Sequence, residues 1–291
     1  MIVERQPSTT SQVREAGRES PISRPAHYFR ALRGIVSREL FKFVHQYGRL
    51  ASALVRPALW LVVFAAGMQN LFGVAPIEPY STYIPYQEYI VPGLLGMVLL
   101  FNGMQSSLSL VYDREMGTMR LVLTAPLPRW YLLLCKLIGG TILSVIQCYA
   151  FLLVALLVGV TIPTIGWLQI LPALLISGFL LGSIGLLLSV YIRQVENFAG
   201  TMNFVIFPMF FLSSALYPLW RLRESGADYI FWLSQLNPFT HAVELVRYAA
   251  YGKFNGIALL IVSSVALLSF LAAAIAYDPQ RGLIRRRHAV A

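Results

Sequence analysis

Charged residues are scarce in this chain: Asp, Glu, Lys and Arg make up 12% of its 291 residues, whereas 57% are hydrophobic. Soluble domains carry roughly 25% charged and about 45–50% apolar residues. A soluble fold of this length has no interior large enough to hide so much apolar surface. The composition excludes a soluble protein and predicts a membrane protein.

Signatures of enzymes and of energy coupling are also lacking. The four His residues show no paired spacing for zinc, and Gly252-Lys253 lacks the upstream glycine of a phosphate-binding loop. The long apolar runs carry no acid or base near their middles, where ion-coupled carriers place ionisable groups. We predict that the chain is not an enzyme and binds no metal, cofactor or nucleotide itself.

Long charge-free apolar runs fill most of the chain. A helix needs about 20 such residues to cross a bilayer, and the alternation typical of membrane strands is missing. One 56-residue run breaks at a turn-like segment, 160–166, and so supplies two helices. The predicted fold class is an all-α membrane protein with six transmembrane helices, at approximately 51–72, 89–111, 132–159, 168–191, 198–217 and 255–277.

The positive charges lie unevenly about this six-helix path. Four of the 23 Lys and Arg residues fall on one side, in the connection before the last helix, and the other 19 fall on the opposite side. This bias places the Lys- and Arg-rich side, with both chain termini, in the cytoplasm. The net charge of +10 therefore indicates orientation in a membrane and not a nucleic-acid partner.

The segments outside the apolar runs complete the predicted organisation. We expect a disordered cytoplasmic tail at 1–26, an amphipathic interfacial helix at 27–50, a transmembrane domain at 51–277 and a basic cytoplasmic tail at 278–291. The interfacial helix could instead pack on a soluble partner. The aromatic-rich connection before the last crossing, divided by two prolines, predicts a re-entrant helical hairpin.

A polar segment after the second crossing carries the strongest local pattern. It runs Asp113-Arg114-Glu115-Met116-Gly117-Thr118-Met119-Arg120, followed by a Leu-rich stretch, Pro126 and Arg129. In this order of elements, and in its six-helix layout, the chain resembles the permease subunits of ABC-2 type transporters, most of which are exporters. The resemblance covers about residues 28–277 and extends to Asn237-Pro238 before the last helix.

The resemblance implies that the polar segment couples the chain to cytoplasmic ABC ATPase subunits, which bind ATP and Mg²⁺. The coupling residues would be Asp113, Arg114, Glu115, Gly117, Thr118 and Arg120. Acidic and basic side chains could dock in a partner by salt bridges, while glycine permits a tight bend. The alternative is an ordinary cytoplasmic loop whose charges face water.

Three further groups of residues are candidates. Arg38, Glu39 and Lys42 of the interfacial helix would brace the ATPase or contact lipid headgroups. Asn102, Gln105, Ser106 and Asn203 either join helices by hydrogen bonds, which we favour, or line a substrate path. In the outer re-entrant segment we single out Asn237, Pro238, Glu244 and Arg247; the last two, three residues apart, form either a stabilising pair or a gate.

The sequence thus predicts a multi-pass permease subunit of an ATP-driven exporter in the prokaryotic cytoplasmic (inner) membrane. Its expected partners are the ATPase subunits, a second permease copy and membrane lipid. An ATP-independent carrier or channel is the main alternative, and the missing intramembrane charges count against it. A membrane-embedded transferase or scaffold would need a cluster of acids, bases or metal ligands at one membrane face, which the sequence does not show.

Overall fold

The structure is a computed structural model, and it describes residues 24–44, 47–68, 73–74, 78–80, 83–117, 127–192 and 194–277. These residues form a bundle of helices with a single pair of two-residue strands, in which Gly73 pairs with Pro85 and Val74 with Ile84. The elements are α2 (Arg24–Val44), α3 (Tyr47–Met68), β1 (Gly73–Val74), β2 (Ile84–Pro85), α4 (Tyr86–Glu115), α6 (Arg129–Leu157), α7 (Gly166–Tyr191), α8 (Val195–Phe211), α9 (Leu219–Glu224), α10 (Asp228–Leu236), α11 (Pro238–Ala250) and α12 (Gly256–Ala276).

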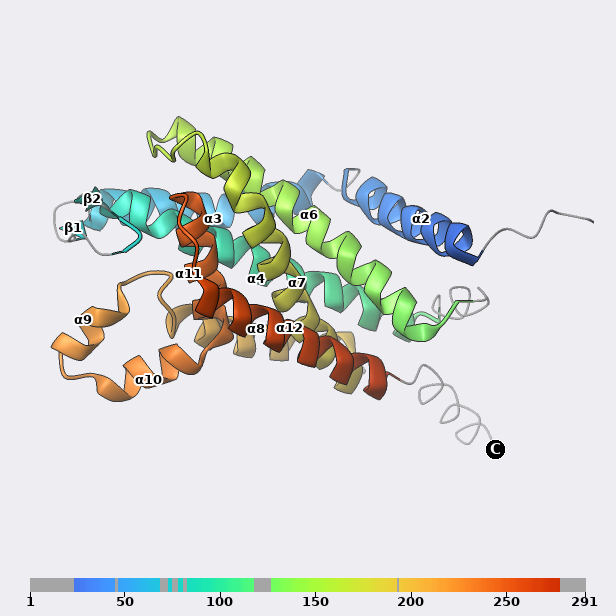
Figure 1. Cartoon of the computed structure of the whole chain (residues 1–291). Coiled ribbons are helices and arrows are strands. Elements are labelled where there is room, and N and C mark those ends of the chain that lie inside the picture. Colours follow the sequence, from blue (N-terminus) through green and yellow to red (C-terminus); the bar gives the residue numbers. More distant parts are fainter. Residues whose placement is uncertain are drawn as a thin grey trace, which may run out of the picture.

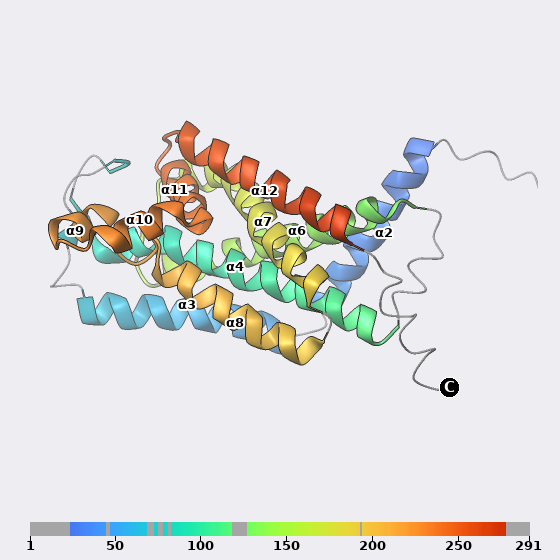
Figure 2. The ribbon, with the colours of Figure 1, turned by 90° about the horizontal axis from the view of Figure 1, so that it is seen from below.

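The bundle has two distinct ends, visible in Figure 1. One end carries α9, α10 and the strand pair, and we call it the α9–α10 end. At the other, the α2 end, α2 lies against the first turns of α6, and α12 ends on the far side of α6 from α2. The helices α3 and α8 each pack on α4, and Figure 2 shows α12 on the opposite side of the bundle from them. The chain thus places α4 and α7 at its centre, where each packs on several other helices.

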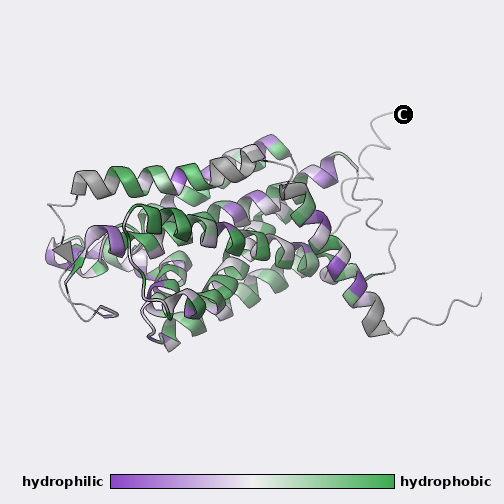
Figure 3. Cartoon of the chain, turned by 90° about the horizontal axis from the view of Figure 1, so that it is seen from above, coloured by the Kyte–Doolittle hydropathy of each residue, from purple (hydrophilic) through white to green (hydrophobic). Residues whose placement is uncertain are grey.

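Four helices, α4, α6, α7 and α12, are long and apolar enough to cross a membrane by length and composition. They coincide with four of the six predicted crossings. At the positions of the other two lie α3, whose apolar stretch is the shorter Leu54–Val63, and α8, which has 17 residues. Figure 3 shows mainly hydrophobic residues on the bundle helices and bands of hydrophilic residues on α2.

Some boundaries differ from those expected. The helix predicted over 27–50 begins at Arg24, inside the expected tail, and ends at Val44. Its last residues belong to α3, which starts at Tyr47. The fifth predicted crossing ends at Phe211, six residues before the expected position, and the chain continues as a buried segment that is not helical. Residues 1–23, most of the expected N-terminal tail, and residues 278–291, the whole of the expected C-terminal tail, lie outside the described residues.

Glycines let α7 approach its neighbours closely. A Cβ atom placed on Gly103 of α4 would lie 2.9 Å from the backbone nitrogen of Gly182 in α7. On the same face of α7, a Cβ atom on Gly178 would lie 3.2 Å from a methyl group of Thr141 in α6. Gly178 and Gly182 are a small-xxx-small pair, which permits close contact of helix backbones. The close approach of the helix backbones at the centre of the bundle therefore requires glycine, which has no Cβ atom, at these positions.

We predict that Gly103→Ala lowers stability and that Gly200→Ala does not. The added methyl group at 103 meets backbone, so the two helices must separate, at a cost of about 1–3 kcal/mol. At Gly200, within α8, nothing lies within 4 Å of an added Cβ, and alanine favours the helix by roughly 0.5–1 kcal/mol. The thermal midpoints of the two purified variants in detergent test this. Equal midpoints would contradict the close crossing of α4 and α7.

Candidate functional sites at the two ends of the bundle

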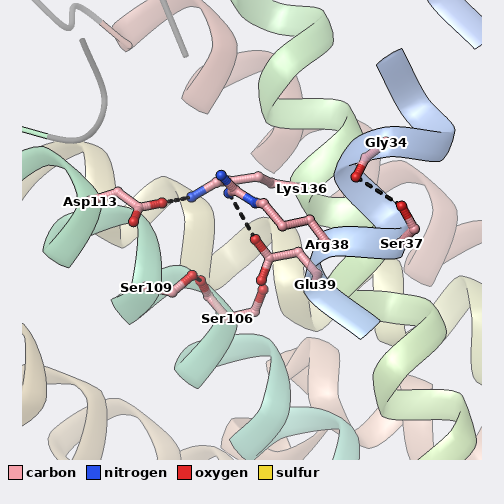
Figure 4. A network of polar contacts seen from close by, with 8 residues as sticks. All are labelled: Gly34, Ser37, Arg38, Glu39, Ser106, Ser109, Asp113 and Lys136. Carbon is pink, nitrogen blue, oxygen red and sulfur yellow. Dashed lines mark hydrogen bonds and ion pairs between the residues drawn. The ribbon is translucent and has the colours of Figure 1, made fainter. Parts of the chain in front are cut away.

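At the α2 end, Asp113 near the end of α4 forms an ion pair with Lys136 of α6. Only 18% and 11% of these side chains are exposed. Figure 4 shows the pair bridging the two helices, with Arg38 and Glu39 pointing toward it from α2. A paired, largely desolvated carboxylate and ammonium attract each other more strongly than the same groups would in water. Asp113 thus holds α4 to α6.

The next residue, Arg114, reaches the end of α7. Its guanidinium donates hydrogen bonds to the carbonyl oxygens of Ser189, at 2.8 Å, and Ile192, at 2.6 Å. The last carbonyl groups of a helix lack partners within the helix, and a cation is favourable there. Arg114, which belongs to α4, therefore supplies hydrogen-bond donors to free carbonyl groups at the carboxyl end of α7.

Glu115 completes the series by contacting the start of α8. Its Oε2 atom accepts a hydrogen bond of 3.0 Å from the backbone nitrogen of Val195, the first residue of that helix. A carboxylate at a helix amino terminus satisfies a free N–H group and is favoured by the helix dipole. Asp113, Arg114 and Glu115 thus connect α4 to α6, α7 and α8 in turn. The sequence pattern did not indicate these contacts within the chain.

Gly117 marks the bend that follows α4. Its φ angle is +76°, in the left-handed region that residues with a Cβ atom rarely adopt, and its nitrogen donates to the carbonyl of Arg114. The bend expected from the sequence is therefore present. Two other coupling candidates, Thr118 and Arg120, lie outside the described residues.

The interfacial candidates belong to α2, which packs along α6. Arg38 and Glu39 form an ion pair of 3.1 Å, and Glu39 lies over Gly139 of α6. At the other end of this contact the Tyr131 hydroxyl donates to the carbonyl of Tyr28 at 2.7 Å. The side chain of the third candidate, Lys42, is outside the described part of the structure.

The four polar residues proposed for the crossings have different surroundings. Asn102 of α4 donates a hydrogen bond to the side-chain oxygen of Gln147 in α6, and both side chains are buried. Ser106 faces Gly140 of α6, and Gln105 is half-buried. Asn203 is exposed on α8. Asn102 therefore joins α4 to α6, as expected for a structural polar residue.

At the α9–α10 end, buried backbone that is not helical lies between α8 and α9. Ser213, Ser214, Ala215 and Leu216 are each at most 7% exposed. Their carbonyl groups have no helical partners, and buried carbonyl groups without partners are costly, most of all at membrane depth. A Cβ atom on Gly93 of α4 would lie only 2.2 Å from the Ala215 oxygen, so glycine makes room for this segment.

Side chains from two helices satisfy these carbonyl groups. The hydroxyl of Tyr86 donates to the Leu216 oxygen at 2.6 Å, and that of Tyr89 donates to the Ser214 oxygen at 3.0 Å. Both tyrosines belong to α4. The guanidinium of Arg247 in α11 donates to the same Ser214 oxygen at 2.7 Å.

Asn237, a candidate from the sequence, has two roles here. Its side-chain oxygen accepts from the nitrogen of Phe239 and so caps α11, with Pro238 as the first residue of that helix. Its amide nitrogen donates to the carbonyl oxygens of Met209 and Leu212, at 2.7 and 2.6 Å. One side chain therefore starts α11 and satisfies the end of α8.

Glu244 and Arg247 form an ion pair on one face of α11. Arg247 is 2% exposed, and its guanidinium also lies 4.2 Å from the centre of the Tyr89 ring. The guanidinium is engaged within the chain, because it donates to both the Glu244 carboxylate and the Ser214 oxygen. The sequence suggested the pairing by spacing, but it did not identify the tyrosines.

We predict that Asn237→Asp destabilises the chain far more than Asn255→Asp. Asn255 caps α12 through its side-chain oxygen alone, which accepts from Ala258, and aspartate keeps this bond. At 237 aspartate keeps the cap but replaces two donated hydrogen bonds with repulsion of two carbonyl oxygens. Each lost bond costs about 1–3 kcal/mol. Thermal unfolding of both variants tests this; similar midpoints would show that the contact to α8 is unimportant.

Within the described residues, no group of three or more His, Cys, Asp and Glu side chains could hold a metal ion. The arrangement is thus a helical membrane bundle in which polar side chains connect helix ends. A family model described as ABC-2 type transporter matches residues 30–251. The chain belongs to the ABC-2 type transporter family.

Curated relatives agree with this assignment. A putative transport permease, ycf38, of Cyanophora paradoxa is 31% identical over 206 residues, covering 68% of this chain and 67% of the relative. The inner membrane transport permease YadH of Escherichia coli (strain K12) is 23% identical over 250 residues, covering 84% of this chain and 92% of the relative. A probable multidrug ABC transporter permease, YbhR, of the same strain is 27% identical over 171 residues, covering 58% of this chain and 45% of that protein. With its apolar helices, the chain is a multi-pass membrane protein of the transport permease class.

Proposed function

We propose that this chain is the transmembrane subunit of an ATP-driven ABC-2 exporter. The observation that carries the proposal is the family match over residues 30–251, which takes in both ends of the bundle. Separate cytoplasmic ABC ATPase subunits would bind ATP and Mg²⁺, and a second permease copy would complete the substrate path. The chain itself would perform no covalent chemistry. The name of the YadH relative favours the cytoplasmic (inner) membrane of a prokaryote.

The proposed topology has six crossings, with α3 and α8 added to the four longer helices. The α2 end faces the cytoplasm, because most Lys and Arg residues lie there, and both termini are cytoplasmic. In this orientation α2 lies at the membrane interface, and α9 to α11 form a re-entrant segment entering from the outer side. The buried non-helical segment 212–217 supports this last part, because such backbone is tolerated at membrane depth only inside protein.

The contacts of α4 suggest how an ATPase could move the bundle. A force on the end of α4 acts through Asp113 on α6, through Arg114 on α7 and through Glu115 on α8. We propose that ATP binding and hydrolysis shift the population between inward- and outward-opening packings through these three contacts. Glu115 is exposed as well as bonded to Val195, so its carboxylate could meet a cation of the ATPase at the same time.

We predict that Glu115→Gln weakens coupling without destabilising the chain. The amide oxygen of glutamine still accepts the Val195 N–H bond, but the charge that a partner would recognise is gone. Affinity for the co-expressed cognate ATPase, and stimulation of its hydrolysis, should fall roughly three- to ten-fold. Glu196→Gln, an exposed change at the start of α8, is the matched control.

Co-purification measures how much ATPase each variant binds, and hydrolysis rates in lipid nanodiscs measure how strongly each variant stimulates it. Full complex formation by Glu115→Gln would show that Glu115 only caps α8. Flux of solute through vesicles that hold this chain alone, without an ATPase or nucleotide, would contradict the wider proposal and favour an ATP-independent carrier or channel.

A further inference from the structure

A cavity of about 320 Å³ lies at the α9–α10 end, beside the buried segment 212–217. Small-molecule sites commonly have volumes of roughly 300–1,000 Å³. The walls come from the loop before α4, from α4 itself, and from α9, α10, α11 and the start of α12. The residues that decide its chemistry are Glu78, Tyr80, Tyr89, Trp220, Thr240, Glu244 and Arg247.

The charges on these walls favour a cation. Arg247 lines the cavity but is 2% exposed, and Glu244, the Ser214 oxygen and the Tyr89 ring already occupy its guanidinium. Glu244 keeps 22% of its side chain exposed, and Glu78 is exposed at the cavity. Two carboxylates are therefore within reach of a ligand, whereas the guanidinium is covered. An anion would meet net negative charge.

Aromatic rings supply the remainder of a site for an organic cation. Tyr80, Tyr89 and Trp220 line the cavity, and aromatic faces attract ammonium groups and bury apolar ligand surface. Burial raises the pKa of the Tyr80 hydroxyl to about 12, so its ring stays a neutral phenol at physiological pH. Two of these rings already attract a cation within the chain: the Arg247 guanidinium lies 4.2 Å from the centre of the Tyr89 ring, and the Arg221 guanidinium lies 5.6 Å from the centre of the Trp220 ring.

Four lining residues carry buried polar atoms that lack a hydrogen-bond partner within the described part of the chain. They are the hydroxyl oxygens of Tyr80 and of Thr240, a residue only 1% exposed, the indole nitrogen of Trp220 and the Nε atom of Arg247. Buried polar atoms are normally paired, and each unpaired one calls for an explanation. A hydroxyl oxygen can accept from an ammonium N–H, and an indole N–H can donate to an oxygen of a ligand. This observation is independent of charge, and it also indicates a ligand.

We propose that this cavity binds an organic ammonium ion with an apolar body, held by Glu78 and Glu244 and packed against Trp220 and Tyr80. As a statement about the transported substrate, the inference rests on the transport function proposed above. Binding to the purified chain requires neither an ATPase nor nucleotide, so the site can be tested separately.

The experiment is equilibrium dialysis of radiolabelled 2-phenylethylammonium against the full-length chain in nanodiscs of zwitterionic lipid, with empty nanodiscs as the blank. Three comparison ligands are dialysed in the same way. They are 2-phenylethanol, a neutral analogue of the cation, phenylacetate, an anionic analogue, and methyl glucoside. The cation should bind saturably, one per chain. Glu78→Gln and Trp220→Leu should each weaken binding about five-fold or more. Glu224→Gln and Trp232→Leu, exposed changes that do not line the cavity, should stay within two-fold of the unmodified chain.

The thermal unfolding midpoint of each of the four variants is measured as a control, to establish that the variant is folded. The proposal is overturned if the cation does not saturate, if phenylacetate or methyl glucoside binds in its place, or if neither cavity variant weakens binding more than its control. ATP-driven uptake of the same cation into inverted vesicles with the cognate ATPase is a separate measurement. Saturable binding without uptake would leave the site in place and contradict the transport proposal.

Discussion

The buried, non-helical backbone between α8 and α9 imposes the constraint on which the rest of the α9–α10 end depends. Its carbonyl groups need donors, because residues 213–216 are buried and are not part of a helix. Tyr86 and Tyr89 supply donors from α4, and Arg247 supplies one from α11. Together with Asn237, which satisfies the end of α8, these contacts fix α4, α8 and α11 relative to one another and leave the neighbouring cavity with its present shape.

The α2 end follows the same principle with different residues. Asp113, Arg114 and Glu115 are consecutive, yet each contacts a different helix, because side chains at successive helix positions point in different directions. Two of these contacts serve free helix ends, the carboxyl end of α7 and the amino end of α8. Polar residues in this bundle thus act mainly where helices stop. Such contacts are suited to transmitting movement between the two ends, because they connect whole helices.

Much of the architecture was predictable from the sequence because apolar runs of about 20 residues specify membrane helices. The positions of α4, α6, α7 and α12 followed directly from such runs. The end of α8 did not, because residues 212–217 carry no charge and continue a long apolar run. Their non-helical path depends on hydrogen bonds from Tyr86, Tyr89 and Arg247, which the sequence does not show. Tyr86 and Tyr89 gave no sequence signal, since tyrosine is also common at membrane interfaces. Asn237 and Arg247 were found, but their carbonyl partners depend on folding.

The most direct test of this account is the free energy of unfolding of Tyr86→Phe compared with Tyr83→Phe. The Tyr86→Phe substitution removes only the hydroxyl that donates to the buried Leu216 oxygen. The Tyr83→Phe substitution removes a hydroxyl from a residue that is 67% exposed. We expect Tyr86→Phe to cost about 1–3 kcal/mol and Tyr83→Phe to cost little. Equal stabilities for the two variants would contradict the claim that donated hydrogen bonds hold the buried segment in place.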